Sequence, residues 1–422
     1  MIRAFAAALA LAVGAGGNGA PPTATPASEK PPATVLGITW HARGFVRPKL
    51  THLKSLSLEP LGRGVSLGVG GGSATTLSRG GRMLALGDEN PGVEIVDLRR
   101  MRKVGAVKLP APGWVTFLSW QHGYLFAVVS RDRSSVVAVI DPVGRQVLQH
   151  YRLARRIIDV QESRGAVVVL TAPRKGIGPL ELTVVGGKGM QSVRVPEIFG
   201  GARVENGEDG YRAREVTPAL AVEPGERAFI VPAGKTVAEV SLHNLAVEYH
   251  TLAEPVSLLR RLHNWLEPSA EAKVLDGPQR KAAWLASGLI AVTGADYTTV
   301  TSASGLDVQV EAAGLSLLDP DDWSIRKIDG ETSDFVSFRT SLLAFGDTSW
   351  GHPAPGLGVV GYDLTGRELF RRFKGTAVSW VEPVEGLAYV SLDEKRRAVL
   401  DAASGRVLSR PHPRRPLSLV VD

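Results

Sequence analysis

One local pattern recurs along this chain of 422 residues. An apolar run is followed by a polar loop, a second apolar run that usually ends in Asp, a short turn and a third apolar stretch. Each copy predicts a small antiparallel sheet that is apolar on both faces and cannot bury them alone. Because such sheets become stable when they stack around an axis, the pattern predicts an all-β fold, a β-propeller. The clearest copies are Met83–Gly87 with Val93–Asp97, Tyr124–Val129 with Val136–Asp141, Ser341–Gly346 with Leu357–Asp363, and Gly386–Val390 with Arg397–Asp401.

The residue that ends the second apolar run measures the length of the repeat. The first three such positions are separated by 44 and 45 residues and the last three by 44 and 38, which is one four-stranded blade. The wider gaps of 55 and 78 residues contain insertions. An Asp carboxylate here can accept N–H bonds from the residues ahead and close the turn, so we assign these aspartates a structural role. The positions are Asp97, Asp141, Gly186, Ser241, Asp319, Asp363 and Asp401.

The N-terminal segment contains a further copy of the repeat. Leu50–Leu61 aligns with Val93–Val104 when Lys54 is placed on Asp97. Val35–Trp40 is then expected to be the strand before it.

The C-terminal segment is expected to complete that first unit. Pro416–Val421 resembles an inner strand such as Ala377–Val381, and no further apolar strand follows it. We expect it to join the first blade and close the ring, because an open ring would leave two unpaired edges. Seven full units and this shared unit favour eight blades. Seven blades remain the alternative, if the N-terminal copy only covers a neighbouring blade.

The repeats resemble the secreted bacterial propellers of the YVTN and WD-like class. The matching pieces are apolar strands such as Leu387-Ala-Tyr-Val, strands that end in Val-Asp, Ile-Asp or Leu-Asp, and turns such as Ser404-Gly-Arg-Val. The resemblance covers roughly Val35 to Asp422, although no repeat has a Tyr-Val-Thr-Asn run and no unit has a Trp-Asp ending. That class includes binding proteins, scaffolds and a few enzymes, so the resemblance implies an architecture and carries over no active site.

The N-terminus predicts export to the cell envelope or the exterior. Met1–Arg3 carries one positive charge, and Ala4–Val13 is an apolar stretch too short to span a bilayer. We expect residues 1–20 to be a signal peptide that is cleaved between Ala15 and Ala20. The alternative is that this stretch is a buried strand or helix.

The remaining chain is expected to hold a linker and one domain. Residues 21–34 are rich in Pro, Ala and Thr and predict a stiff, extended linker. Residues 35–422 are expected to form a single β-propeller domain with insertions at 199–215, 254–279 and 293–313. No other stretch approaches membrane-spanning length, so we expect no transmembrane segment in the mature chain, and we expect a monomer.

Composition narrows the possible chemistry. The chain has no Cys, which excludes a lipoprotein anchor, thiolate metal sites and thiol nucleophiles. The net charge is +7, but no basic run is long enough to predict nucleic-acid binding. A basic exported protein could adhere to anionic polymers or lipid surfaces. The alternative is a solvated, Arg-rich surface with no such role.

The lengthened connections are predicted to lie on one face. In a propeller, the loops that join the second strand to the third, and the fourth to the next blade, emerge on the same side. Loops longer than a turn requires usually have a function or are disordered, so we expect this face to bind a partner, with decoration as the alternative. The five lengthened connections are Thr171–Gly178, Phe199–Glu215, Glu254–Gln279, Thr293–Ala313 and Gly346–Gly356.

Two of these insertions carry local signals. Ser257–Leu266 has leucines and Trp265 at helical spacing, so it is expected to be either a cap on the rim or an amphipathic lid over the channel. Thr293–Ala313 is expected to be mobile or to form a hairpin. Aromatic groups on exposed loops suit contacts with a sugar or a peptide, although the tryptophans could instead pack on the rim. The candidate ligand-binding residues on this face are Trp265, Tyr297, Asp347, Trp350, His352, Arg174 and Lys175.

Catalytic motifs are missing from the sequence. There is no His pair at i,i+4 spacing and no Gly-x-Ser-x-Gly elbow, and the Gly68–Gly72 run lacks the Lys of a phosphate loop. The acidic clusters Asp88–Asn90 and Asp319–Asp322 lack the spacing of an EF-hand loop. We therefore expect no cofactor and no metal, and we assign no catalytic residue.

These observations favour an exported, non-catalytic β-propeller that binds a protein, a peptide or an envelope polymer through the face with the long loops. The alternative is a hydrolase or lactonase-type enzyme with a divalent ion at the channel mouth. A quinone-dependent dehydrogenase has less support, because the repeated Trp-docking pattern of that class is absent. A structural assembly module is a further alternative.

The signal-peptide prediction can be tested directly. Mass spectrometry of the protein purified from its own cells should place the N-terminus of the mature chain between residues 16 and 21. A mature chain that retains Ala4–Val13 would contradict export by this route.

Overall fold

A computed structural model describes most of the chain. All regular elements in its described part are β-strands, which confirms the all-β prediction. No helix in that part is long and apolar enough to cross a membrane. The expected signal peptide and nearly all of the linker lie outside the description. The described residues are 32–39, 47–68, 74–87, 92–130, 135–207, 210–252, 275–302, 305–346, 356–378, 380–392, 396–413 and 417–420.

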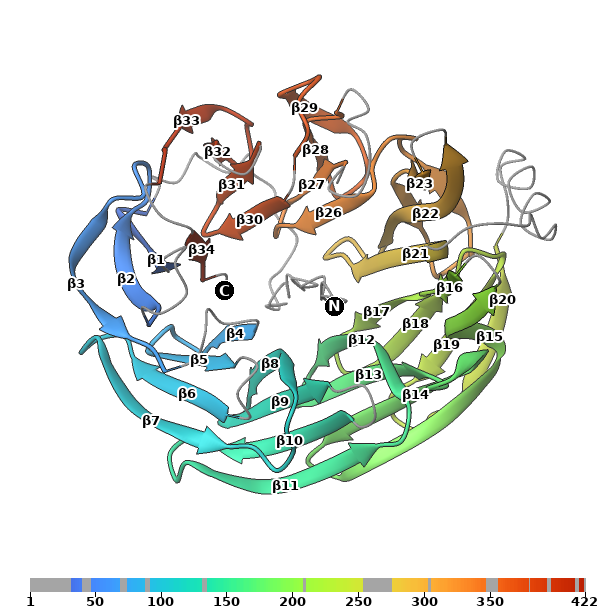
Figure 1. The fold of residues 1–422 in the computed structure, drawn as a ribbon, viewed down its shortest axis with the longest axis horizontal. Coiled ribbons are helices and arrows are strands. Elements are labelled where there is room, and N and C mark those ends of the chain that lie inside the picture. The colour runs from blue at the N-terminus through green and yellow to red at the C-terminus, as the bar shows by residue number, and fades with distance from the viewer. Residues whose placement is uncertain are drawn as a thin grey trace. The chain divides into compact units, whose positions relative to one another are not determined.

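In these described ranges the strands form eight four-stranded antiparallel sheets, the blades of a β-propeller (Figure 1). Six blades are separate sheets, and two are joined by strand β16 into a ten-stranded sheet. The blades belong to two compact units. Unit 1 contains Lys30–Ala154 and Pro411–Asp422, and unit 2 contains Arg155–Arg410.

Unit 1 holds three blades. Blade 1 has the strand order β3-β2-β1-β34, and blades 2 and 3 contain β4 to β7 and β8 to β11 in sequence order. The strands are β1 (Thr34–Thr39), β2 (Lys49–Lys54), β3 (Pro60–Ser66), β34 (Leu417–Leu419), β4 (Ala74–Leu77), β5 (Met83–Gly87), β6 (Gly92–Asp97), β7 (Arg102–Lys108), β8 (Trp114–Gln121), β9 (Tyr124–Ser130), β10 (Ser135–Asp141) and β11 (Gln146–Leu153).

The C-terminal strand completes blade 1, as predicted. Strand β34 pairs antiparallel with β1, with Leu417 opposite Thr39 and Leu419 opposite Gly37. Both leucines are buried. Gly37 leaves the space that Leu417 needs, because a Cβ at Gly37 would lie 2.7 Å from a methyl carbon of that leucine. The described residues therefore form eight blades, and the alternative of seven is not observed.

Unit 2 holds five blades and the extra strands β16 and β23. Blade 4 contains β12 to β15, blade 5 β17 to β20, blade 6 β21, β22, β24 and β25, blade 7 β26 to β29, and blade 8 β30 to β33. The strands are β12 (Arg156–Ser163), β13 (Ala166–Ala172), β14 (Gly176–Gly186), β15 (Gly189–Gly207), β16 (Gly210–Val216), β17 (Ala219–Glu223), β18 (Arg227–Val231), β19 (Thr236–Ser241), β20 (Val247–Thr251), β21 (Leu275–Trp284), β22 (Ile290–Ser302), β23 (Gly305–Ala312), β24 (Ser316–Leu318), β25 (Ile325–Lys327), β26 (Asp334–Ser337), β27 (Ser341–Phe345), β28 (Val359–Asp363), β29 (Glu368–Arg372), β30 (Trp380–Val384), β31 (Leu387–Ser391), β32 (Arg397–Asp401) and β33 (Val407–Ser409).

The repeated aspartates close turns, as the sequence predicted. The Asp141 carboxylate accepts the N–H of Val143 at 2.9 Å, and the Asp401 carboxylate accepts the N–H of Ser404 at 2.8 Å. Asp363 accepts the N–H groups of Thr365 and Arg367. Burial alone would raise the pKa of Asp363, but these hydrogen bonds to its charged form hold that pKa below the usual value. The aspartates therefore act as turn formers.

Neighbouring blades pack through apolar side chains, and polar side chains form hydrogen bonds between blades at their outer edges. The second and third strands of blades 2, 3, 7 and 8 are almost wholly buried; every residue of β31, for example, is buried. Outer arginines then reach neighbouring blades: Arg326 donates to the carbonyl of Thr365, and Arg372 donates to that of Gly405 at 2.8 Å. Some of the arginines in the chain therefore stabilise the contact between blades.

Removing the side chain of Leu417 should weaken the closure of blade 1. The change Leu417→Ala should lower the free energy of unfolding by about 2–5 kcal/mol, because a buried leucine leaves a cavity beside Gly37. Chemical denaturation would measure this loss. The neighbouring change Ser418→Ala is the control and should have little effect. Equal stability of the two variants would contradict the proposed role of β34.

Candidate functional site

The insertions in blades 4 and 6 fold into one hydrogen-bonded sheet. Strand β15 continues beyond its blade and β16 turns back beside it. Strand β16 then pairs in parallel with the start of β21, with Ala213 opposite Leu275. Strand β22 likewise continues beyond its blade and pairs with β23. We call this the extension sheet; it comprises residues 176–179 of β14, 199–207 of β15, all of β16, 275–279 of β21, 293–302 of β22, and all of β23.

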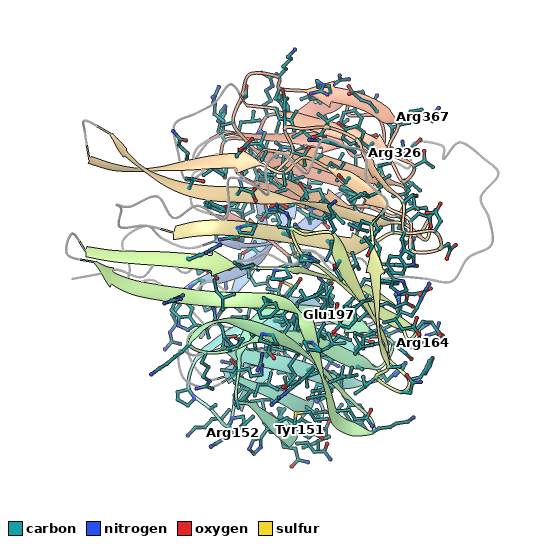
Figure 2. All side chains as sticks on the ribbon, turned by 90° about the vertical axis from the view of Figure 1, so that its right-hand side faces the viewer. Tyr151, Arg152, Arg164, Glu197, Arg326 and Arg367 are labelled. Atoms are coloured by element: carbon teal, nitrogen blue, oxygen red, sulfur yellow. The ribbon has the colours of Figure 1, made fainter. Side chains whose placement is uncertain are left out.

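The extension strands project together from the blades of unit 2. In Figure 2 the green β15–β16 ribbon and the tan β21 to β23 strands extend toward the left of the view. The parallel β16–β21 pairing shows that they are neighbours in space as well as in the picture. Residues of two predicted insertions, Phe199–Glu215 and Thr293–Ala313, therefore lie in this one sheet.

Backbone hydrogen bonds anchor this sheet where it leaves the blades. Thr217 donates its N–H to the carbonyl of Pro278 at 2.9 Å, and Arg280 donates to the carbonyl of Thr217 at 2.8 Å. The Arg280 guanidinium also lies 2.7 Å from the Asp296 carboxylate. The strands of two different blades are therefore tied together at their base.

Two glycines allow the strands to approach one another closely where the extension sheet leaves the blades. Gly277 and Gly294 have φ values of 129° and 147°, a region that residues with a Cβ rarely adopt. A Cβ at Gly277 would collide with the backbone carbonyl of Glu215, and one at Gly294 would collide with that of Gln279. The close approach of β16, β21 and β22 therefore depends on glycine at both positions.

The extension sheet has one exposed polar face and one half-buried face. Directly opposite residues of paired strands share a face. On one face, the register places Arg203 opposite Arg214 and Thr298 opposite Gln309, and all four side chains are exposed. Positions one step along the strands belong to the other face, where the described side chains are half-buried. They are Ala202, Glu215, Tyr297 and Val310.

The half-buried face is linked to the first strand of blade 4. The guanidinium of Arg156 forms an ion pair with the carboxylate of Glu215. Arg155 donates to the carbonyl of Pro179, at the edge of β14. The exposed face is therefore the one that the described part of the chain leaves open to a partner.

Three of the seven predicted contact residues lie in the described chain. Arg174 and Lys175 are exposed on the bend between β13 and β14, next to the extension sheet. Tyr297 lies in β22 on the half-buried face of the extension sheet. The four other candidates lie outside the described residues. They are Trp265, Asp347, Trp350 and His352.

Several insertions differ from the predicted loops. Within Thr171–Gly178 only Pro173–Lys175 is a connection, because strands β13 and β14 include the flanking residues. Residues 199–207 and 210–215 belong to strands β15 and β16, and Thr293–Ala313 contains a hairpin, one of its two predicted forms. These strands were not predicted, because the extra residues between the apolar runs were interpreted as loops. The helix expected at Ser257–Leu266 lies outside the described residues.

The most important omissions were Arg203 and Arg214. Their segments contain a hairpin signal, since Asp209-Gly210 stands between two stretches that alternate polar and apolar residues. That signal could have indicated the β15–β16 ribbon. The β16–β21 pairing has no comparable local signal, because its partners are some sixty positions apart in sequence.

A second polar group lies on the inner strands of unit 2. Lys281 of β21 lies 2.6 Å from the carboxylate of Asp334 in β26 and donates to the carbonyl of Phe335 at 2.8 Å. Asp159 of β12 is buried and accepts the N–H groups of Val160 and Leu220 at 2.7 and 3.1 Å. These contacts connect β12 with β17 and β21 with β26, so they stabilise the packing of blades.

Burial raises the pKa of Asp159 from 3.8 to about 7. The two backbone hydrogen bonds and the positive charge of Lys281 favour the charged form and offset part of that effect. The folded chain therefore retains a proton on this carboxyl at pH values where the unfolded chain has lost it.

A metal centre finds no support among the described side chains. No group of three or more His, Cys, Asp or Glu residues there is arranged to hold an ion. The acidic cluster Asp319–Asp322 consists of turn formers, since Asp319 accepts the N–H of Asp321 and Asp322 accepts that of Ser324. The cluster Asp88–Asn90 and most of the Gly68–Gly72 run lie outside the described residues.

Comparisons with known proteins support the fold alone. No protein-family model matches this chain, and no curated protein matches it. The structure is similar to that of dihydro-haem d1 dehydrogenase NirN in complex with DHE, with a TM-score of 0.56 and 15% identity over 91% of this chain and 74% of that one. It is also similar to the computationally designed Ika8 protein, with a TM-score of 0.50 and 13% identity over 85% of this chain and 92% of that one.

The protonation of Asp159 should make stability depend on pH. Because its pKa is higher in the folded chain, the contribution of the carboxyl is present near pH 4 and declines as the pH rises to about 7, by a few kcal/mol in all. The variant Asp159→Asn has no proton to lose. Denaturation at several pH values should show the stability of the wild type falling relative to the variant across this interval.

The matched control is Asp363→Asn. The pKa of Asp363 is lowered in the folded chain, so the stabilisation by its carboxylate is lost only as the pH falls below about 4. Above that pH, the difference in the free energy of unfolding between the wild type and Asp363→Asn should stay constant. Parallel pH profiles of the wild type and Asp159→Asn would contradict the assigned ionisation.

Proposed function

We propose that this chain is an exported, non-catalytic β-propeller that binds a partner through the exposed face of the extension sheet. The partner is a protein, a peptide or an envelope polymer. The lack of catalytic motifs in the sequence and of a described metal-ligand group supports binding over hydrolysis. The single observation that carries the proposal is the joining of strands from blades 4 and 6 into a sheet that the blades themselves do not need.

The extension sheet costs conformational entropy to form, which supports the view that it has a function. Blades 5, 7 and 8 of the same unit are complete with four strands and without such extensions. The extension sheet needs additional ordered strands, and ordering each residue has an entropic cost of about 1–2 kcal/mol. It also needs the glycines at 277 and 294. An exposed, rigid and polar surface is a suitable platform for recognition.

Shortening the ribbons tests this proposal. Gly201 and Val216 are directly paired, as are Ala295 and Ala312, so an Asn-Gly turn can replace the residues between the members of each pair. We expect both shortened variants to keep the blade fold, as judged by circular dichroism and thermal unfolding. Their retention on envelope fractions from the producing cells should fall at least several-fold.

The control for general surface effects lies in unit 1. Leu148 and His150 of β11 are exposed, and replacing both with Ser should leave retention unchanged. Wild-type retention by both folded ribbon variants would reject the extension sheet as the binding surface.

A further inference from the structure

Blade 2 of unit 1 carries exposed arginines on the two turns at one of its ends. Strands β4 to β7 alternate in direction, so the β4–β5 turn and the β6–β7 turn emerge at the same end of the blade. The carbonyl of Arg82 in the first turn accepts the N–H of Leu98 in the second at 3.0 Å, which joins the two turns. The exposed arginines on these turns and at the start of β7 are Arg79, Arg82, Arg99, Arg100 and Arg102.

Blade 3 extends this basic surface. Arg145, in the turn between β10 and β11, donates to the carbonyl of Val104 in β7 at 3.3 Å. Strands β7 and β11 lie side by side at the outer edge of the two blades (Figure 1). In the same turn the side chain of Val143 is 88% exposed, and Tyr124, which begins β9 at this end of the blade, is 47% exposed. We call residues 79–82, 97–102, 122–124 and 141–145 the basic turn face.

The positive charge of the basic turn face is poorly balanced by carboxylates of the described chain. The described residues of blades 2 and 3 include three carboxylates, namely Glu94, Asp97 and Asp141. Glu94 is buried within its blade and forms an ion pair with a lysine of β7. Asp141 closes its own turn, and Asp97 closes another turn and lies 3.6 Å from the guanidinium of Arg100. Most of the arginine charge on this face therefore has no carboxylate partner among the described residues.

The turn geometry does not require these arginines. In blades 2 and 8 the turn closes in the same way, because an Asp carboxylate accepts the N–H of the third residue after it. In blade 8 that third residue is Ser404, preceded by Ala, whereas blade 2 has Arg99 and Arg100 at these positions. The corresponding turn of blade 6 carries the opposite charge, on Asp321 and Asp322. Clustered like charges repel each other, and an external anion would relieve that repulsion.

We infer that the basic turn face docks on a membrane surface of anionic phospholipids. Basic residues are attracted to an anionic leaflet, and guanidinium groups bind phosphate through two parallel hydrogen bonds. The arginines stand at turns on one end of the blades, which suits a flat surface of headgroups. A soluble anionic polymer would not need the exposed Val143 and Tyr124, whereas both side chains suit the boundary between headgroups and acyl chains. This surface belongs to unit 1, so the inference goes beyond the function proposed for the extension sheet.

Binding to lipid vesicles tests this inference with the chain purified from its own cells. Vesicles of phosphatidylglycerol and phosphatidylcholine should bind the wild type in a sedimentation assay, and vesicles of phosphatidylcholine alone should not. The variant Arg82→Gln/Arg99→Gln should bind the anionic vesicles at least tenfold more weakly, because each basic residue near an anionic leaflet strengthens binding by about fivefold. Equal binding of the wild type to both kinds of vesicle would overturn the inference.

The matched control is Lys108→Gln/Arg152→Gln. Both residues are exposed near the far ends of β7 and β11, about 20 Å along the strands from the turns, and Arg152 is labelled in Figure 2. This variant has the same net charge as Arg82→Gln/Arg99→Gln and should bind anionic vesicles like the wild type. Equal weakening by both variants would indicate attraction by net charge alone and would overturn the inference.

Val143 distinguishes a membrane from a soluble polymer. The change Val143→Ser keeps the N–H that Asp141 accepts and should weaken binding to anionic vesicles several-fold, while Val143→Trp should strengthen it. Neither change should alter binding to soluble polyphosphate. If the wild type binds polyphosphate through Arg82 and Arg99 but does not bind anionic vesicles, the face recognises a soluble polymer and the inference fails.

Two further measurements separate this inference from the proposed function. The variants with shortened extension ribbons should bind anionic vesicles like the wild type, and loss of that binding would overturn the inference because it would assign the lipid contact to unit 2. Envelope fractions from which lipid has been extracted should retain Arg82→Gln/Arg99→Gln as well as they retain the wild type. Weaker retention of this variant on lipid-free fractions would show that the arginines bind another envelope component and would also overturn the inference.

Discussion

A four-stranded sheet that is apolar on both faces is unstable until a neighbour covers each face. Strand β31 shows this requirement, since all of its residues are buried, and strand β9 is buried at five consecutive positions. Burial of apolar surface contributes about 25 cal/mol per Å², which makes contact between blades the main source of stability. The placing of β34 beside β1 follows from the same requirement, because Leu417 and Leu419 cover the core of blade 1.

Polar contacts then specify how neighbouring blades of a unit meet. Asp159 accepts the N–H of Leu220, and Lys281 lies against the carboxylate of Asp334, so each pair connects the inner strands of two blades. A buried carboxyl must be hydrogen-bonded or neutral, and Asp159 satisfies this through its backbone donors and its raised pKa. These residues resemble a catalytic constellation in composition, but the described contacts give each of them a structural partner.

The extension sheet is the part of unit 2 that blade packing does not explain. It exists because a ribbon from blade 4 can approach β21 of blade 6 closely enough for parallel pairing, and glycine at position 277 makes that approach possible. The exposed and half-buried faces of this sheet follow from strand alternation. Its exposed face places Arg203 and Arg214 directly opposite each other.

Local sequence determined the elements that depend on neighbouring residues. Alternating apolar runs and turn-forming aspartates such as Asp141 were sufficient to predict the blades, and the alignment of Lys54 with Asp97 placed the end of β2 correctly. The apolar character of Pro416–Val421 predicted the closure of blade 1. These features were predictable because strand alternation and turn geometry act over a few residues.

Only the tertiary structure decided which distant segments became neighbours. The joining of Ala213 with Leu275 results from the projection of whole strands beyond their blades. A parallel pair has no turn between its strands and therefore leaves no local mark in the sequence. The fold was thus determined by short-range pattern, whereas the candidate binding surface was decided by long-range pairing, whose partners are set by the packing of complete blades.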